Sequence, residues 1–288
     1  MTVIVAVVAV IALGVGGGAT AALLFAGDDS STSAPPPSRP AETDSEPPGP
    51  AEAPEGAPVN VPAGLERYYE QVPGWEACGD LECATLTVPV DYAEPDGETL
   101  ELELQRTVAT DRAARVGSLV VNPGGPGAPG TSMTESADFF FTPALLARVD
   151  VVAFDPRGTG GSDPVDCISD DELDEFLAQD PAPDDAAEAE AFLEEQEQFF
   201  DGCVASSDSL VGHVSTVEAA RDMDVLRGAL REEQLAYLGF SYGTTLGSVY
   251  AELFPDNVGR FVLDGATDPT LDFRENSLSQ ARGFQTAL

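Results

Sequence analysis

The sequence predicts an α/β fold in which a mostly parallel sheet is covered by helices on both faces. Short apolar segments typical of buried strands alternate along the chain with segments that carry apolar residues at helical spacing. Three glycine-rich turns follow such strands, after Asn122, Phe154 and Phe240. Because functional groups gather at the carboxyl ends of the strands in sheets of this kind, we expect the three turns to meet at one edge.

The predicted elements begin with two strands at the edge of the sheet. Apolar and polar residues alternate over 84–90 and 99–108, on either side of a turn at 94–97, which predicts an antiparallel pair. Further strands are predicted at 117–122, 150–154, 234–238 and 260–264. Helices are predicted within 132–149, over 170–179, 186–201 and 244–254, from a capping box at Ser215 and Glu218 to residue 230, and from 278 onward.

The chain divides into three parts before any motif is considered. Residues 1–26 are almost wholly apolar, which suits either a cleaved signal peptide or a retained membrane anchor. Residues 27–63 are rich in Pro, Ala and Glu and lack apolar periodicity, as in a disordered tether. Residues 64–288 are therefore expected to be a folded domain that is exported, either secreted or held outside a membrane or in a cell wall.

Four cysteines indicate the same compartment. Cys78 and Cys83 bracket a four-residue loop, and Cys167 and Cys203 flank an acidic helical stretch. Disulfides within each couple would close two local excursions, although four cysteines allow three pairings and the sequence does not choose among them. Because the spacings match no zinc pattern and the chain has one histidine, no metal site is expected.

The charge of the chain excludes several classes of partner. The formal net charge is −38, from 51 acidic and 13 basic residues, and every basic residue is arginine. Nucleic acid and anionic lipid would be repelled, since both need clusters of Lys or Arg. The acidic run at 170–197 is interpreted as a solvated helix face. No GK[ST] follows the glycine-rich turns, so neither a phosphate site nor a cofactor is expected.

The pentapeptide GFSYG at 239–243 supplies a candidate nucleophile, Ser241. It lies between the apolar run at 234–238 and the helical segment at 244–254, and a strand–turn–helix of this kind presents a strained serine at the edge of a sheet. Gly239 and Gly243 leave room for strand and helix to approach each other. The alternative is a turn or capping serine with no chemical role.

A reacting serine also needs donors for the developing oxyanion. The backbone amide of Tyr242, next to the nucleophile, is one candidate, and the amide of Gly125, in the turn after Asn122, is the other. A tight turn without a ligand is the alternative for that loop. Arg157, in the turn after Phe154, is expected to pair with carboxylates and hold the loops, with substrate contact as the alternative.

Several motifs in order carry a family resemblance. NPGGPG at 122–127, FDPRGTGGS at 154–162, GFSYG at 239–243 and VLDG at 262–265 resemble the α/β-hydrolase-fold exopeptidases, in particular the secreted tripeptidyl aminopeptidases of actinobacteria, relatives of the proline iminopeptidases. The resemblance implies an α/β-hydrolase fold and release of short N-terminal peptides through an acyl-enzyme at Ser241. It also implies Gly125 as the oxyanion residue, because Pro123 to Gly127 stands where iminopeptidases have HGGPG; Pro123 replaces the histidine.

The acid and base of a triad are the open part of this interpretation. The fold orders its triad as Ser, Asp, His along the chain, yet no histidine follows Ser241 and His213 precedes it. Asp264 is a possible acid by position, whereas the resemblance gives it a structural role. We expect the triad Asp and His, with the substrate-binding lid, beyond Leu288, so that the fold is incomplete at the C-terminus. The alternatives are an esterase or lipase on the same fold, or a truncated, non-catalytic, surface-tethered domain.

Overall fold

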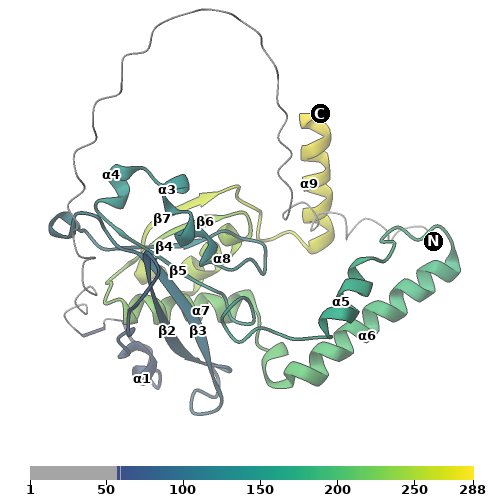
Figure 1. The fold of residues 1–288 in the computed structure, drawn as a ribbon, viewed down its shortest axis with the longest axis horizontal. Helices are drawn as coiled ribbons and strands as arrows, with labels where there is room; N and C mark the ends of the chain where they lie inside the picture. The colour runs from purple at the N-terminus through teal and green to yellow at the C-terminus, as the bar shows by residue number, and fades with distance from the viewer. Residues whose placement is uncertain (1–56, 59) are drawn as a thin grey trace, which may run out of the picture.

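The computed structural model describes residues 57–58 and 60–288. The predicted signal peptide or anchor at 1–26, and most of the tether predicted at 27–63, lie outside the described residues. Within the described part of the chain, no helix is long and apolar enough to cross a membrane. Figure 1 shows a body built around a sheet, with the helices α5, α6 and α9 extending away from it.

The described residues form one seven-stranded mixed sheet in the order β1-β2-β3-β5-β4-β6-β7. The strands β1 (Glu76–Cys78), β2 (Leu81–Pro89) and β3 (Thr99–Thr107) are antiparallel, and β3 also pairs antiparallel with β5 (Asp150–Phe154). The strands β5, β4 (Ser118–Asn122), β6 (Leu235–Phe240) and β7 (Val258–Asp264) run parallel. The predicted edge pair and the four further strands are confirmed, and β1 is an addition that the sequence does not predict.

Helices cover the two faces of this sheet. The helices α1 (Glu66–Tyr69), α7 (Thr216–Ala229) and α8 (Tyr242–Leu253) pack on one face, against side chains such as Val120 and Val152. The helices α2 (Ser132–Glu135), α3 (Ala137–Phe140) and α4 (Pro143–Leu146) cover the other face, against Val121 and Val151. Because successive residues of a strand point to opposite faces, the continuous apolar runs of β4 and β5 bury both sides.

One helix differs from the prediction, and one edge strand has an exposed face. Among the described residues β7 has an open face, where Val262 is 57% exposed. The helix predicted within 132–149 is three single turns, because the backbone leaves the helical region at Ser136 and Phe141. Thr142 is extended before Pro143, as the proline ring requires of the preceding residue, and Pro143 then begins α4.

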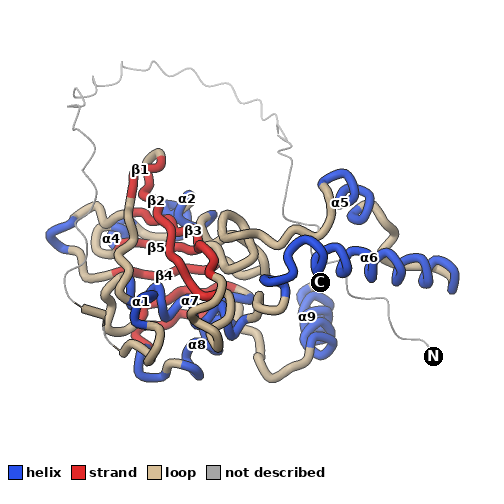
Figure 2. The backbone as a smooth tube through the Cα atoms, turned by 90° about the horizontal axis from the view of Figure 1, so that it is seen from below, coloured by secondary structure: helices blue, strands red, loops and turns tan. Residues whose placement is uncertain are grey.

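Two acidic helices form an arm, residues 163–212, that extends from the body (Figures 1 and 2). They are α5 (Asp170–Leu177) and α6 (Ala186–Val211), and α6 is ten residues longer than predicted. The rings of Phe176 and Phe199 stack at 4.6 Å between centroids and join the two helices. The remaining short or terminal elements are η1 (Arg112–Ala114), η2 (Pro255–Asn257) and α9 (Phe273–Ala287).

The direction of strand order reverses between β4 and β6, beside the centre of the sheet. The chain leaves β4 toward β5 on one side, whereas it leaves β6 toward β7 on the other side. Strands β4 and β6 are neighbours, with Asn122 opposite Gly239. A reversal of strand order of this kind opens a crevice at the carboxyl ends of the two strands, and the turns after Asn122 and Phe240 lie there.

Candidate active site

Ser241 lies at the tip of the turn between β6 and α8. Its φ of 52° and ψ of −119° fall in a region that residues with a side chain rarely adopt. A Cβ on Gly239 would lie 2.4 Å from the carbonyl oxygen of Gly243, so the turn tolerates no side chain at Gly239. The structure thus places Ser241 on a strained strand-to-helix turn, as expected from the sequence.

The backbone of Ser241 is held while its hydroxyl is left open. Its amide donates to the carbonyl oxygen of Asp264 at 2.9 Å, and its carbonyl accepts from the Thr244 hydroxyl at 2.6 Å. Among the described residues, no group forms a hydrogen bond with the Ser241 hydroxyl, and the residue is exposed. The hydroxyl is therefore available to a base and to a substrate.

The turn after β4 lies directly against Ser241. A Cβ on Gly124 would lie 2.5 Å from the carbonyl oxygen of Phe240, 3.0 Å from the Ser241 Cβ and 3.1 Å from the Tyr242 nitrogen. Gly124 has a φ of +101° and is buried. The sequence analysis singles out Gly125 as the oxyanion residue. In the structure, Gly124 is the residue of this turn that packs against the nucleophile turn, and glycine spacing alone does not predict that contact.

The amides near Ser241 differ in whether they are already engaged. The Gly124 amide donates to the side-chain Oδ1 of Asn122 at 2.9 Å. Among the described residues, the amides of Gly125 and Tyr242 donate no hydrogen bond. The Tyr242 amide belongs to the first turn of α8, where helix amides lack intrahelical partners. Two amides without a partner among the described residues thus lie in the two turns that meet at the serine.

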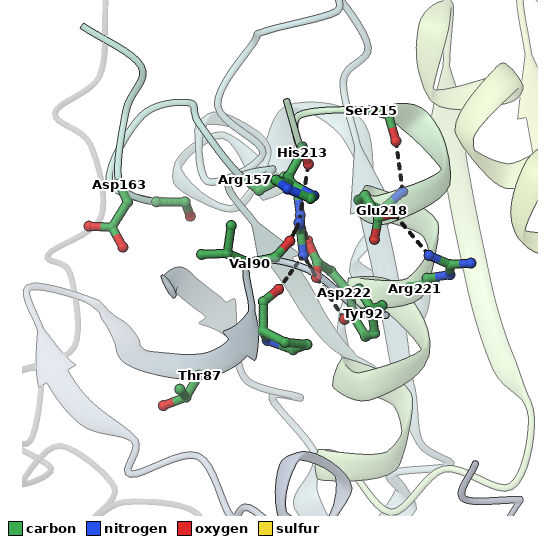
Figure 3. A network of polar contacts seen from close by, with 12 residues as sticks. Thr87, Val90, Tyr92, Arg157, Asp163, His213, Ser215, Glu218, Arg221 and Asp222 are labelled. Carbon is green, nitrogen blue, oxygen red and sulfur yellow. Dashed lines mark hydrogen bonds and ion pairs between the residues drawn. The ribbon is translucent and has the colours of Figure 1, made fainter. Parts of the chain in front are cut away.

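The turn after β5 carries a buried ion pair between Arg157 and Asp222 (Figure 3). The Arg157 guanidinium donates to both carboxylate oxygens of Asp222, at 2.6 and 2.8 Å, and its side chain is 1% exposed. It also donates to the carbonyl oxygens of Val90 and His213. The structure therefore gives Arg157 the loop-holding role expected from the sequence.

Tyr92 completes this buried cluster. Its hydroxyl donates to Asp222 at 2.8 Å, and the Arg157 guanidinium lies 5.5 Å from the centre of its ring. Burial, together with the neighbouring Asp222 carboxylate, raises the pKa of Tyr92 well above its usual value. The cluster joins the segment after β2, the turn after β5 and α7. It therefore holds these three segments together near the carboxyl ends of the strands.

Asp155 connects two of the glycine turns. One carboxylate oxygen accepts from the amide and hydroxyl of Thr131 at 3.0 and 2.9 Å, and the other accepts from the Gly161 amide at 2.9 Å. The carbonyl oxygen of Asp155 accepts from Ser162 at 2.7 Å. The sequence contained Asp155 in a recognised motif but gave no signal for this bridging role.

The candidate base and acid are not brought to the serine hydroxyl. His213 follows α6, where its amide donates to Leu210 and its carbonyl accepts from Arg157; among the described residues its ring forms no hydrogen bond with Ser241. Asp264 ends β7 beside Ser241 but contacts it through the backbone, and its side chain is exposed. Neither residue occupies a triad position in this structure.

Ser215 and Glu218 form only half of the predicted capping box. The Ser215 hydroxyl accepts from the Glu218 amide at 3.2 Å, as expected of an N-cap. The Glu218 carboxylate instead pairs with Arg221 at 2.9 Å, one turn further along α7 (Figure 3). Arg221 lies three residues after Glu218 and offers a charged donor. The Glu218 carboxylate therefore pairs with Arg221 and does not accept from the Ser215 amide, as a full capping box would require.

The four cysteines form the two local pairs. Cys78 joins Cys83 at the β1–β2 turn, and Cys167 joins Cys203 at the base of the arm. Among the described residues, no group of three or more His, Cys, Asp or Glu side chains is placed to hold a metal ion. The first disulfide joins two neighbouring strands of the sheet and the second closes the arm, so neither belongs to the turns that carry Gly124 and Ser241.

A strained serine between a parallel strand and a helix, at a crevice shared with a glycine turn, defines the nucleophile elbow of the α/β hydrolases. A family model described as the alpha/beta hydrolase fold matches residues 117–288, and the chain belongs to this family. The matched region includes both the turn after β4 and Ser241. The fold class expected from the sequence is confirmed.

Curated relatives are similar over most of the chain. "Serine protease Hip1" of Mycobacterium tuberculosis is 41% identical over 235 residues, 81% of this chain and 44% of that protein. "Tripeptidyl aminopeptidase" of Streptomyces coelicolor is 39% identical over 69% of this chain and 38% of that protein. "Carboxylesterase B" of Mycobacterium tuberculosis is 38% identical over 84% and 47%. The chain thus spans less than half the length of these relatives.

Proposed function

We propose that this chain carries the nucleophile and the oxyanion hole of a serine peptidase that removes short peptides from the N-terminus of its substrates. One observation carries the proposal: the Ser241 hydroxyl is exposed and unpartnered among the described residues, and the unpartnered amides of Gly125 and Tyr242 lie in the two turns that meet there. A nucleophile with preorganised donors beside it is the arrangement that acyl transfer requires.

The reaction has two acyl transfers. Ser241 Oγ bonds to the carbonyl carbon of the scissile peptide while its proton passes to a base, and the amides of Gly125 and Tyr242 donate to the oxyanion. The carbon–nitrogen bond then breaks as the base returns the proton to the leaving amine. Water repeats the sequence on the acyl-enzyme and regenerates the Ser241 hydroxyl.

The base and its orienting acid are proposed to come from outside the described residues. The fold places both after the nucleophile in the chain, whereas His213 precedes it and its carbonyl belongs to the Arg157 cluster. The relatives, which are more than twice as long as the part that this chain covers, support the same assignment. Asp264 is not assigned as the acid, because among the described residues its hydrogen bond to Ser241 is made by its backbone carbonyl and the residue is exposed.

Peptides are the proposed substrates, and esters are the second candidate. Two relatives bear the names serine protease and tripeptidyl aminopeptidase, which supports peptide-bond hydrolysis with a free N-terminus. A third is named carboxylesterase B, which supports ester hydrolysis on the same elbow. Amides and esters both react through a tetrahedral intermediate with an oxyanion, so the elbow itself does not separate the two substrates.

We propose that the domain works outside the cytoplasm. The two disulfides support this location, because such bonds persist in oxidising compartments and are rare in the cytosol. The net charge of −38 is consistent with a domain that stays away from anionic lipid surfaces.

The test uses the full-length gene product with three fluorogenic substrates: a tripeptide amide with a free amine, its N-acetylated form, and an ester of the same tripeptide. The proposal expects cleavage of the free-amine amide and loss of cleavage on N-acetylation. Ser241→Ala should abolish turnover and labelling by a fluorophosphonate probe, while Ser248→Ala, in the helix after the elbow, should leave both unchanged. Cleavage of the ester alone would support the esterase, and absence of labelling would support a non-catalytic domain.

A further inference from the structure

We propose that Asn122 is a positioning residue that couples the oxyanion loop, residues 122–127, to the nucleophile elbow, residues 239–243. The inference rests on the proposed function and assigns a role to a side chain that the sequence marks only as part of a family motif. Asn122 ends β4 and is fully buried, opposite Gly239 of β6 in the parallel register. It therefore stands where the two turns leave the sheet.

Asn122 organises the oxyanion loop through its side-chain oxygen. Its Oδ1 accepts a hydrogen bond from the Gly124 amide, two residues on, at 2.9 Å. Asn side chains stabilise turns in this way because the carboxamide imitates a backbone carbonyl. Since the Gly124 amide is engaged within the loop, the amide of Gly125 becomes the one left for an incoming oxyanion.

The same residue packs against the nucleophile elbow. A Cβ on Gly243 would lie 2.9 Å from the Asn122 Oδ1 and 2.9 Å from its carbonyl oxygen, so Gly243 and Asn122 are in close contact. From the other side, Gly124 packs onto Phe240 and Ser241. The Asn122 side chain thus links the two strand ends, and its position sets the separation of the Gly125 and Tyr242 amides.

The chemistry of the side chain matters as well as its shape. The Asn122 Nδ2 is buried without a hydrogen-bond partner among the described residues. Burying an unpaired donor is unfavourable, so a smaller apolar residue would be the better choice if only packing were needed. A neutral carboxamide supplies the acceptor for Gly124, whereas a carboxylate would bring a negative charge to the place where the oxyanion forms.

The experiment compares three substitutions in the full-length protein. Asn122→Ser keeps a neutral acceptor, Asn122→Asp keeps the acceptor and adds a charge, and Asn122→Ala removes the acceptor. Asn257→Ala is the matched control, because Asn257 is also buried but donates to Asp224 on α7 and accepts from Asn60, away from the oxyanion loop. The readouts are kcat, KM, the Ki of a tripeptide aldehyde that forms a tetrahedral adduct, and the urea midpoint.

We expect Asn122→Ala and Asn122→Asp to lower kcat by about 10- to 100-fold, with KM within about threefold of wild type. This decrease in kcat is smaller than the one that follows removal of an oxyanion donor itself. The aldehyde Ki should rise in proportion, and Asn122→Ser should retain most of both. The activity of Asn122→Asp relative to wild type should increase as the pH falls, because protonation removes the added charge. Asn257→Ala should change the urea midpoint and leave kcat unchanged.

The possible failures are distinguishable. A wild-type protein that cleaves no acyl substrate would refute the proposed function, and this inference with it. If the wild type is active but Asn122→Ala keeps its kcat and aldehyde Ki, only the positioning role is wrong. Where Asn122→Ala does not fold, the other two variants decide: a loss of kcat of about 10- to 100-fold in Asn122→Asp with Asn122→Ser close to wild type would support the proposal, and a wild-type kcat in Asn122→Asp would overturn it.

Discussion

The backbone amide of Ser241 donates a hydrogen bond to the backbone carbonyl of Asp264, with 2.9 Å between nitrogen and oxygen. This bond ties the nucleophile turn to the end of β7, where Phe240 and Asp264 are register partners. A Cβ on Gly265 would lie 3.7 Å from the same nitrogen, so β7 approaches the elbow closely. Asp264 thus holds the nucleophile turn through its backbone carbonyl, and the residue is exposed to solvent.

Substitution of the Asp264 side chain should therefore have little effect on turnover. Asp264→Asn and Asp264→Ala keep the backbone carbonyl, and we expect kcat/KM within about threefold of wild type, against the roughly 10⁴-fold loss typical of a removed triad acid. The measurement is kcat/KM on the free-amine tripeptide substrate. A loss of three orders of magnitude in both variants would show that the Asp264 carboxylate takes part in the triad.

Gly124 and Gly127 form a matched pair for testing the contact between the oxyanion loop and the elbow. Both have positive φ, 101° and 95°, but a Cβ would collide with Phe240 and Ser241 at Gly124 and would meet nothing within 4 Å at Gly127. Each Ala substitution costs on the order of 1 to 2 kcal/mol of backbone strain. Only Gly124→Ala should also lower kcat, by at least about tenfold, because it displaces the elbow.

The two variants are compared by urea denaturation and by turnover. A larger loss of stability in Gly124→Ala, because its Cβ collides with the elbow, together with a loss of kcat in that variant alone, is the expected result. Equal kcat in the two variants would mean that the loop does not need its close contact with Ser241 for the reaction.

The buried Arg157–Asp222 pair should contribute strongly to stability. Both side chains are at most 1% exposed, so Asp222→Asn leaves a buried guanidinium without its counter-charge, and we expect a loss of about 3–5 kcal/mol in the free energy of unfolding. Glu218→Gln, one turn earlier on α7, is the control, since its partner Arg221 is 37% exposed and such pairs contribute about 1 kcal/mol or less. Urea unfolding at neutral pH measures both, and similar losses would contradict this assignment.

Buried tyrosines should make the protein sensitive to alkaline pH. Burial, with the Asp224 carboxylate next in effect, raises the pKa of Tyr69 and Tyr250, and burial raises that of Tyr237. Unfolded tyrosine ionises near pH 10, so the stabilisation is complete below about pH 10 and is lost as the pH rises above it. Each such tyrosine contributes a slope of about 1.4 kcal/mol per pH unit.

The urea midpoint between pH 8 and 11 measures this loss. The chain has no lysine, so tyrosines dominate the titration in this range. Tyr69→Phe should reduce the slope of stability against pH by the contribution of one tyrosine. It also lowers the stability at neutral pH, because it removes a hydrogen-bond donor to Asp224. An unchanged slope would show that Tyr69 ionises freely in the folded protein.

Local patterns in the sequence determined the elements and the nucleophile turn. The strand at 150–154 was predicted with its observed bounds, and Ser241 was placed between β6 and α8, because alternation, helical spacing and glycine placement act within a few residues. The same reasoning predicts helix within 132–149 without locating the breaks at Ser136 and Phe141, where the backbone leaves the helical region.

What only the tertiary structure decided concerns residues far apart in the chain. The pairing of Cys167 with Cys203, the ion pair between Arg157 and Asp222, and the contacts of Gly124 and Asn122 with the elbow all depend on the order of strands in the sheet. Periodicity reports which face of an element is buried but not which element lies beside it, so these contacts have no local signal. The sequence by itself therefore determined the fold class and the serine, and the packing of β4 against β6 decided which residues surround it.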